Sequence, residues 1–89
     1  MTGKWVSVEQ LKMMAVFTTD PLSWFDSNLI EKKTDLPAST IRHLLFTFFR
    51  FGLLERFEVH RGYRYRLSPK AEAQPYFAKL QAASAVMPT

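Results

Sequence analysis

The feature that most constrains the fold is an amphipathic helical run that ends at a glycine and leads directly into an alternating segment. Apolar residues recur at three- and four-residue spacing from Ile41 to Phe48, which is the period of one helix face. Gly52 follows this run and is suited to end a helix, because glycine adopts left-handed geometry at low cost. Apolar and charged residues then alternate on either side of residues 60–62, a pattern typical of a β-hairpin. We therefore expect a helix followed directly by two antiparallel strands.

The alternation assigns each hairpin residue to a face, because successive side chains of a strand point to opposite sides. Gly62 is expected to supply the positive φ of a tight turn. The inward face is predicted to be aromatic and aliphatic, with Phe57, Val59, Tyr63, Tyr65 and Leu67. The outward face is predicted to be cationic, and its members are Glu58, Arg64 and Arg66.

Other helices are predicted from residues that start or stop them. Ser7 and Gln10 form a capping box, in which each side chain bonds the backbone of the other. An extended piece is expected around Trp24-Phe25. The predicted helices cover about residues 7–18, two turns from residue 26 or 27, a helix from residue 37 or 39 to 51, and a last one over about 69–86 that kinks or restarts at Pro75.

The order of these elements indicates the fold class. Three helices, a hairpin and a last helix are the order of a winged helix-turn-helix, which is mainly α with a small β-hairpin. Eighty-nine residues suffice for one such domain and exclude a second. We expect a single domain over residues 1–89, with a three-helix core and wing over about 7–72 and a C-terminal helix.

Three segments resemble known bacterial regulators. Residues 34–45, TDLPASTIRHLL, and the closing residues 51–56, FGLLER, resemble the DNA-binding domain of IclR-type regulators, with MarR-type domains next. Residues 65–71, YRLSPKA, look like the wing exit of those families. The resemblance covers about residues 8–72. It implies a sequence-specific DNA-binding protein, a small transcriptional regulator of bacterial, plasmid or phage type.

The sequence departs from this resemblance in three places. Trp24-Phe25-Asp26 looks like an insertion before the second helix. Phe46, Phe49 and Phe51 stand where such domains commonly carry small or charged residues. The effector-binding domain of IclR-type regulators is expected to be absent, because the sequence ends at Thr89. No ligand sensing is therefore carried over.

The third helix is the predicted DNA-reading element. Its side opposite the apolar arc offers cations and hydroxyls, which read base edges or bind phosphates in a major groove. Twelve Lys and Arg against eight Asp and Glu give a net charge of +4, which favours a polyanionic partner such as double-stranded DNA. The predicted contacts are Ala38, Ser39, Thr40, Arg42, His43, Thr47 and Arg50 on the helix, and Arg61, Arg64 and Arg66 in the wing.

Phe46 does not fit this face, because it lies about 140° from the centre of the apolar arc. We favour packing of this ring under the wing or the last helix. A contact with thymine methyl groups is a second reading. In a third, Phe46, Phe49 and Phe51 form a protein-binding patch, and the chain is a winged-helix adaptor instead of a DNA reader.

The last helix offers two interpretations of similar weight. It either folds back on its own domain or forms an arm of a homodimer, which would match a two-fold DNA site. The residues expected in such a dimer are Trp5, Tyr76, Phe77, Leu80 and Ala83.

The composition provides no support for catalysis, a metal site or a membrane span. The eight acidic residues are dispersed, there is no cysteine, and the three glycines are too separate to form a nucleotide loop. No apolar run approaches the roughly 18 residues that span a bilayer. We expect a cytoplasmic protein that is not an enzyme and has no cofactor.

Overall fold

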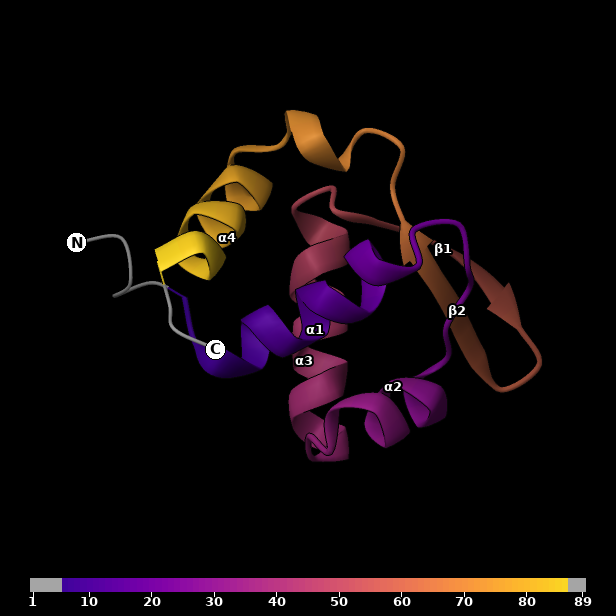
Figure 1. Ribbon diagram of the computed structural model, residues 1–89. Coiled ribbons are helices and arrows are strands. Elements are labelled where there is room, and N and C mark those ends of the chain that lie inside the picture. The colour runs from indigo at the N-terminus through magenta and orange to yellow at the C-terminus, as the bar shows by residue number, and fades with distance from the viewer. Residues whose placement is uncertain (1–5, 87–89) are drawn as a thin grey trace.

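The computed structural model describes residues 6–86 and has the element order of a winged helix (Figure 1). The predicted fold class, mainly α with a small hairpin, is confirmed. The elements are α1 (Val8–Thr19), α2 (Ser27–Thr34), α3 (Ala38–Arg50), β1 (Leu54–Val59), β2 (Gly62–Leu67), a short 3-10 turn (Ala71–Ala73) and α4 (Pro75–Val86).

The first two helices begin at side-chain caps. The Ser7 hydroxyl accepts a hydrogen bond from the Gln10 amide at 3.2 Å, and the Gln10 side chain accepts one from the Ser7 amide at 2.7 Å. This is the predicted capping box. The Asp26 carboxylate accepts from the Leu29 amide at 2.8 Å, so Asp26 is the N-cap of α2.

Helix α3 ends in the glycine motif expected from the sequence. Gly52 has a φ of 79°, and its amide donates to the Phe49 carbonyl at 3.1 Å. The Leu53 amide donates to the Phe48 carbonyl at 2.9 Å. These two bonds satisfy carbonyl groups that the end of a helix leaves without partners. They also turn the chain sharply from α3 into β1.

The last helix restarts at Pro75, which is one of the two outcomes predicted for this proline. The Ser68 hydroxyl accepts from the Lys70 amide at 3.1 Å, and the chain then makes only the 3-10 turn. Proline lacks an amide proton and has a fixed φ, so it opens a helix more readily than it continues one. α4 is therefore shorter than the predicted range of 69–86.

The register of the hairpin corrects the predicted faces. Leu54 lies opposite Leu67, Arg56 opposite Tyr65, and Phe57 opposite Arg64. Residues directly opposite each other in a sheet share a face. Phe57 and Val59 thus lie on the outward face with Arg64 and Arg66, and the prediction that they point inward is wrong. The inward face consists of Leu54, Arg56, Glu58, Tyr63, Tyr65 and Leu67.

The register follows from the two ends of the hairpin. Leu54 and Leu67 pair beside the core, and only two residues connect the strands at the other end. Because the side-chain period of a strand is two, starting the inward set at Leu54 places Phe57 outward. Gly62 has the expected positive φ, 149°, and Arg61 also adopts a positive φ of 70°.

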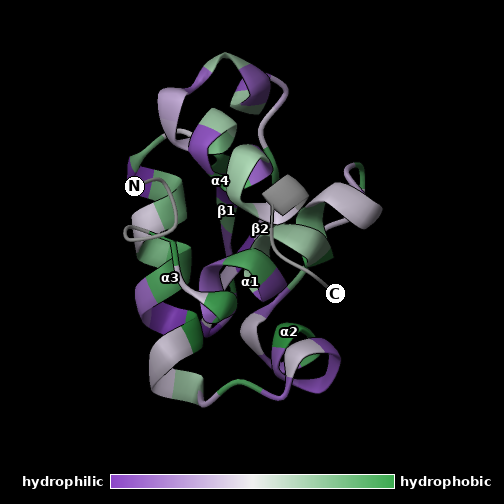
Figure 2. Cartoon of the chain, turned by 60° about the vertical axis from the view of Figure 1, so that its left-hand side comes forward, coloured by the Kyte–Doolittle hydropathy of each residue, from purple (hydrophilic) through white to green (hydrophobic). Residues whose placement is uncertain are grey.

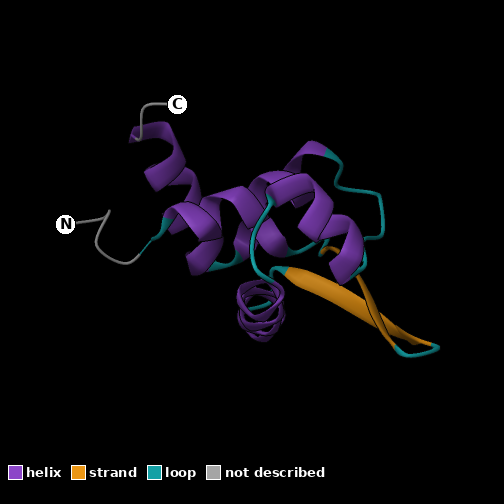
Figure 3. Cartoon of the chain, turned by 90° about the horizontal axis from the view of Figure 1, so that it is seen from below, coloured by secondary structure: helices purple, strands orange, loops and turns teal. Residues whose placement is uncertain are grey.

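The extended piece before α2 pairs with β2 through one antiparallel bridge. Phe25 and Tyr65 exchange two backbone hydrogen bonds, each of 2.8 Å. The Phe25 side chain is buried and contacts Phe17 edge-on at 5.4 Å between ring centroids. This bridge fixes the base of the wing to the helical core, while the remainder of the hairpin projects beyond the helices (Figure 3).

The core lies between the helices and the base of the hairpin. Its largest fully buried side chains come from α1, α2, α3, α4 and the residue before β1, and they are Phe17, Phe48, Met13, Ile30, Ile41, Leu53 and Leu80. Among residues 6–86, no helix combines the length and the apolar character that crossing a bilayer requires.

Helix α4 folds back on its own domain. Phe77, Leu80 and Ala83 are at most 3% exposed and belong to the core, so these side chains do not offer the predicted dimer surface. Tyr76 accepts a hydrogen bond of 2.8 Å from the Gln10 side chain of α1. Trp5, the other residue expected at a dimer contact, lies outside the described residues.

Candidate nucleic-acid interface

Helix α3 separates an apolar side from a cationic one. Figure 2 shows hydrophobic and hydrophilic bands following one another along this helix. Ile41, Leu44, Leu45 and Phe48 are buried. The exposed residues include five of the predicted DNA contacts, and these are Ala38, Ser39, Arg42, His43 and Arg50.

The two predicted threonines are less available than the other contacts. Thr40 and Thr47 are half-buried. The Thr47 hydroxyl donates to the His43 carbonyl one turn earlier, at 2.9 Å. Its proton is therefore already used within the helix.

The exposed face of α3 carries positive charge that no salt bridge of the described residues compensates. No acidic residue occurs between Asp35 and Glu55, an interval that contains Arg42, His43 and Arg50. Within the described part of the chain, the one ion pair joins Arg66 to Glu55 on the hairpin. The positive charge of α3 is thus not compensated by a salt bridge, which favours an anionic ligand.

Phe46 lies in the middle of this exposed face. Its side chain is 56% exposed, so the expectation that it packs under the wing or the last helix is wrong. Two other exposed rings have aromatic neighbours: Phe51 contacts Tyr76 at 5.1 Å, and Phe57 contacts Trp24 at 4.6 Å between centroids. No such ring contact involves Phe46 among residues 6–86.

The structure does not bring all three wing arginines to the side of α3. Arg61 is exposed in the turn at the tip. Arg64 and Arg66 lie on the outward face, which is opposite to the face that contacts α3. The Nε atom of Arg66 donates to Glu55 at 2.8 Å, and its guanidinium lies 4.4 Å from the Trp24 ring centroid. Arg66 is therefore neutralised by a carboxylate.

Arg56 is a cation at this surface that is not among the predicted DNA contacts. Its guanidinium carbon lies 4.0 Å from the centroid of the Phe49 ring of α3 and 4.1 Å from that of Tyr63 in β2. The hairpin register places Arg56 beside Tyr63, because the two residues are diagonal neighbours on one face of the hairpin. Arg56 packs over the ring of Phe49, which is half-buried in the structure.

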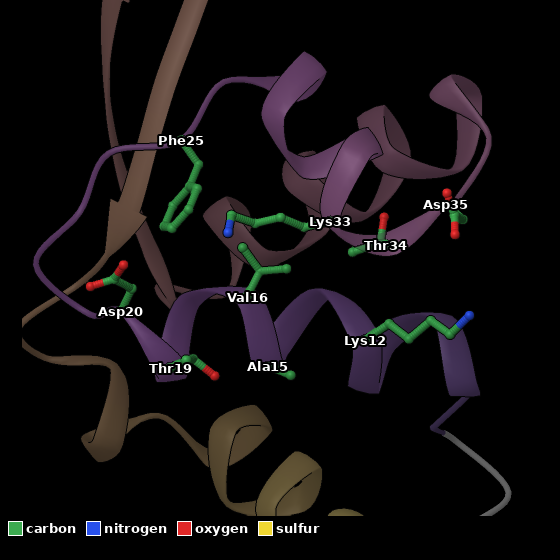
Figure 4. Close-up of a pocket in the computed structure, with 9 residues that line it drawn as sticks. All are labelled: Lys12, Ala15, Val16, Thr19, Asp20, Phe25, Lys33, Thr34 and Asp35. Atoms are coloured by element: carbon green, nitrogen blue, oxygen red, sulfur yellow. The ribbon is translucent and has the colours of Figure 1, made fainter.

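Of the pockets in the described structure, one lies away from α3, and another borders the C-terminal end of α3 at Thr47 and Phe51. One, of about 550 Å³, is formed between α1 and α2, where the Lys33 side chain extends towards Phe25 (Figure 4). The other, of about 420 Å³, is lined mainly by apolar groups, including Val6, Phe51 and Tyr76. Burial raises the pKa of the Tyr76 phenol above its ordinary value. No group of three metal-ligating side chains occurs among the described residues.

Comparison with known proteins extends to the fold alone. The chain is similar to a solved structure described as a possible transcriptional regulator from Methanosarcina mazei Go1, with a TM-score of 0.67 and 21% sequence identity. The match covers 90% of this chain and 71% of that one. No protein-family model and no curated protein matches the sequence. The winged-helix architecture is thus shared with this structure, while the IclR-type or MarR-type assignment stays a prediction.

Proposed function

We propose that this protein is a winged-helix transcriptional regulator that binds duplex DNA in the cytoplasm through α3. The observation that carries the proposal is the exposed face of α3, where Arg42, His43 and Arg50 lie together with no acidic residue between Asp35 and Glu55. A helix of this kind fits the major groove, which is about 12 Å wide and carries donors and acceptors on its base edges.

The position of a residue along α3 decides whether we propose that it contacts a base edge or a phosphate. In the winged-helix mode of binding, the N-terminal part of the recognition helix reaches deepest. Ser39, Arg42 and His43 are therefore the proposed base-edge contacts, and Arg50 at the other end is a proposed phosphate contact. Arg61 at the tip of the hairpin reaches a flanking phosphate or the adjacent minor groove. Arg66 is left out because Glu55 neutralises it.

Two further facts support the class of function. The structural neighbour is described as a possible transcriptional regulator, and residues 34–45 and 51–56 resemble IclR-type DNA-binding domains. We propose that the chain is related to IclR-type regulators. We also propose that it has no catalytic role. The proposal requires only one copy of the chain, since Phe77, Leu80 and Ala83 of the predicted dimer contact lie in the core.

Arg42→Ala and Arg50→Ala provide the test, because both remove one cation from the same helix face. A duplex is first selected from a random library, and a scrambled duplex of equal length serves as reference. Arg42→Ala is expected to reduce the preference for the selected duplex about tenfold, since a base-edge contact discriminates by about 1–3 kcal/mol. Arg50→Ala is expected to weaken binding to both duplexes alike. Equal, sequence-blind losses for the two variants would contradict the assignment.

The exposure of Phe46 favours a second candidate function, a protein-interaction module. A large apolar ring in water is typical of docking surfaces. However, Arg56 covers Phe49, so the expected patch of three free rings is reduced to Phe46 and Phe51, and Phe51 already contacts Tyr76. Titration of the wild-type chain against random duplex at two salt concentrations separates the candidates. Salt-independent or absent binding favours the adaptor.

A further inference from the structure

The junction between α3 and the hairpin holds a guanidinium with no polar partner in the described structure. Arg56 is half-buried and contacts the rings of Phe49 and Tyr63 at 4.0 and 4.1 Å. Among residues 6–86, no hydrogen bond or ion pair involves its side chain. Glu58 shares its face of the hairpin but makes no salt bridge with it.

Aromatic contacts hold a cation without neutralising it. The quadrupole of each ring attracts the guanidinium, yet neither ring accepts the strong hydrogen bonds that its five N–H groups can donate. Because the two rings come from α3 and from β2, they fix the position of Arg56 relative to both elements. The side chain therefore loses little further rotational freedom when it binds an anion.

The shape of duplex DNA places a phosphate chain at this junction. If α3 lies in a major groove and the hairpin tip reaches the adjacent minor groove, the backbone that separates the two grooves has to cross between α3 and the hairpin. We infer that Arg56 binds a phosphate of the DNA backbone at this crossing and that Phe49 and Tyr63 position it. This inference rests on the proposed function and adds a phosphate site to it.

Arg66 supplies a matched control within the same hairpin. It also contacts an aromatic ring, that of Trp24 at 4.4 Å. It differs in two respects, since Glu55 neutralises it and it points to the face opposite α3. A general effect of wing charge would affect both arginines, whereas a phosphate site at the junction affects Arg56 alone.

The experiment measures the affinity of full-length variants for a random-sequence duplex across a series of salt concentrations. Arg56→Gln is expected to bind about tenfold more weakly at low salt, because it loses one charge-assisted contact. The slope of log affinity against log salt should fall in magnitude by about 0.9, the value for one phosphate contact. Arg56→Lys should keep the wild-type slope, because it keeps the charge. Arg66→Gln should keep both the slope and the affinity of the wild type.

A second neutral variant separates the loss of the charge from a loss of folding. Arg56→Met places an apolar chain between the two rings, and thermal unfolding verifies that each variant is folded. The inference is overturned if folded Arg56→Gln and Arg56→Met bind with the wild-type slope, if Arg56→Lys loses the same slope as the neutral variants, or if Arg66→Gln loses as much as they do. If the wild-type chain itself shows no salt-dependent binding, the proposed DNA-binding function fails first, and the two failures are thereby distinguished.

Discussion

Phe46 and Phe48 lie two residues apart on α3, and their replacement tests how the structure divides this helix between core and surface. Phe48 is 0% exposed, and its ring contacts Tyr76 edge-on at 5.6 Å between centroids. Truncating a buried phenylalanine to alanine costs about 3–5 kcal/mol of unfolding free energy, because apolar contacts are lost and a cavity remains. A domain of this length has roughly 5–10 kcal/mol in total. Phe48→Ala is therefore expected to remove a large part of the stability.

Phe46→Ala is expected to change the unfolding free energy by less than about 1 kcal/mol. More than half of this side chain is already in water, so its truncation forfeits only a fraction of the roughly 1.5–3 kcal/mol that complete burial provides. Alanine also has a higher helix propensity than phenylalanine, which returns about 0.5 kcal/mol.

Urea unfolding followed by far-ultraviolet circular dichroism measures both variants against the wild type. The expected result is a lower midpoint for Phe48→Ala at an unchanged slope, and a midpoint near that of the wild type for Phe46→Ala. A loss of more than about 2 kcal/mol for Phe46→Ala would place it among buried positions. That result would refute the reasoning, because Phe46 would then pack against protein and the exposed face of α3 would be misassigned.

Two further predictions concern the end of α3 and the contact of α4 with α1. Gly52→Ala should lower the unfolding free energy by about 1–2 kcal/mol in the same urea assay. Gly52 has a φ of 79°, and an added Cβ would lie 3.1 Å from the Gln74 side chain. An unchanged urea midpoint would contradict this prediction. Burial raises the pKa of the Tyr76 phenol above its ordinary value of 10.0, so folding favours the neutral form. This stabilisation is complete below pH 10 and is lost as the pH rises through the folded-state pKa. The unfolding free energy of the wild type should therefore fall above pH 10 more steeply than that of Tyr76→Phe. Parallel pH profiles of the two proteins would contradict this prediction.

The ends of the helices could be predicted from the sequence because local residues determine them. Ser7 and Gln10 cap α1 through bonds between residues three apart, and Gly52 ends α3 through its own backbone conformation. Pro75 restarts the last helix because of its covalent structure. Each signal acts within a few residues, so no knowledge of the tertiary fold was needed.

The faces of the hairpin and of α3 could not be predicted in the same way, because distant segments determine them. The pairing of Leu54 with Leu67 places Phe57 outward, although alternation around the turn suggested the reverse. That register also brings Arg66 opposite Glu55, where the two form an ion pair.

The exposure of Phe46 depends on whether the hairpin or α4 covers the middle of α3. The helical period of the sequence does not determine which elements pack there. The hairpin instead contacts α3 at Phe49, through the guanidinium of Arg56. Phe46 is consequently left exposed between the cations of the candidate interface.

The most direct test of the account is a nuclear magnetic resonance titration of the isotope-labelled chain with a short duplex. The account predicts that amide shifts change along the exposed face of α3 and at the hairpin tip, around Arg42 and Arg61, and that these changes diminish as salt is added. Shift changes confined to the pocket between α1 and α2, or to the outward face around Trp24 and Phe57, would contradict it.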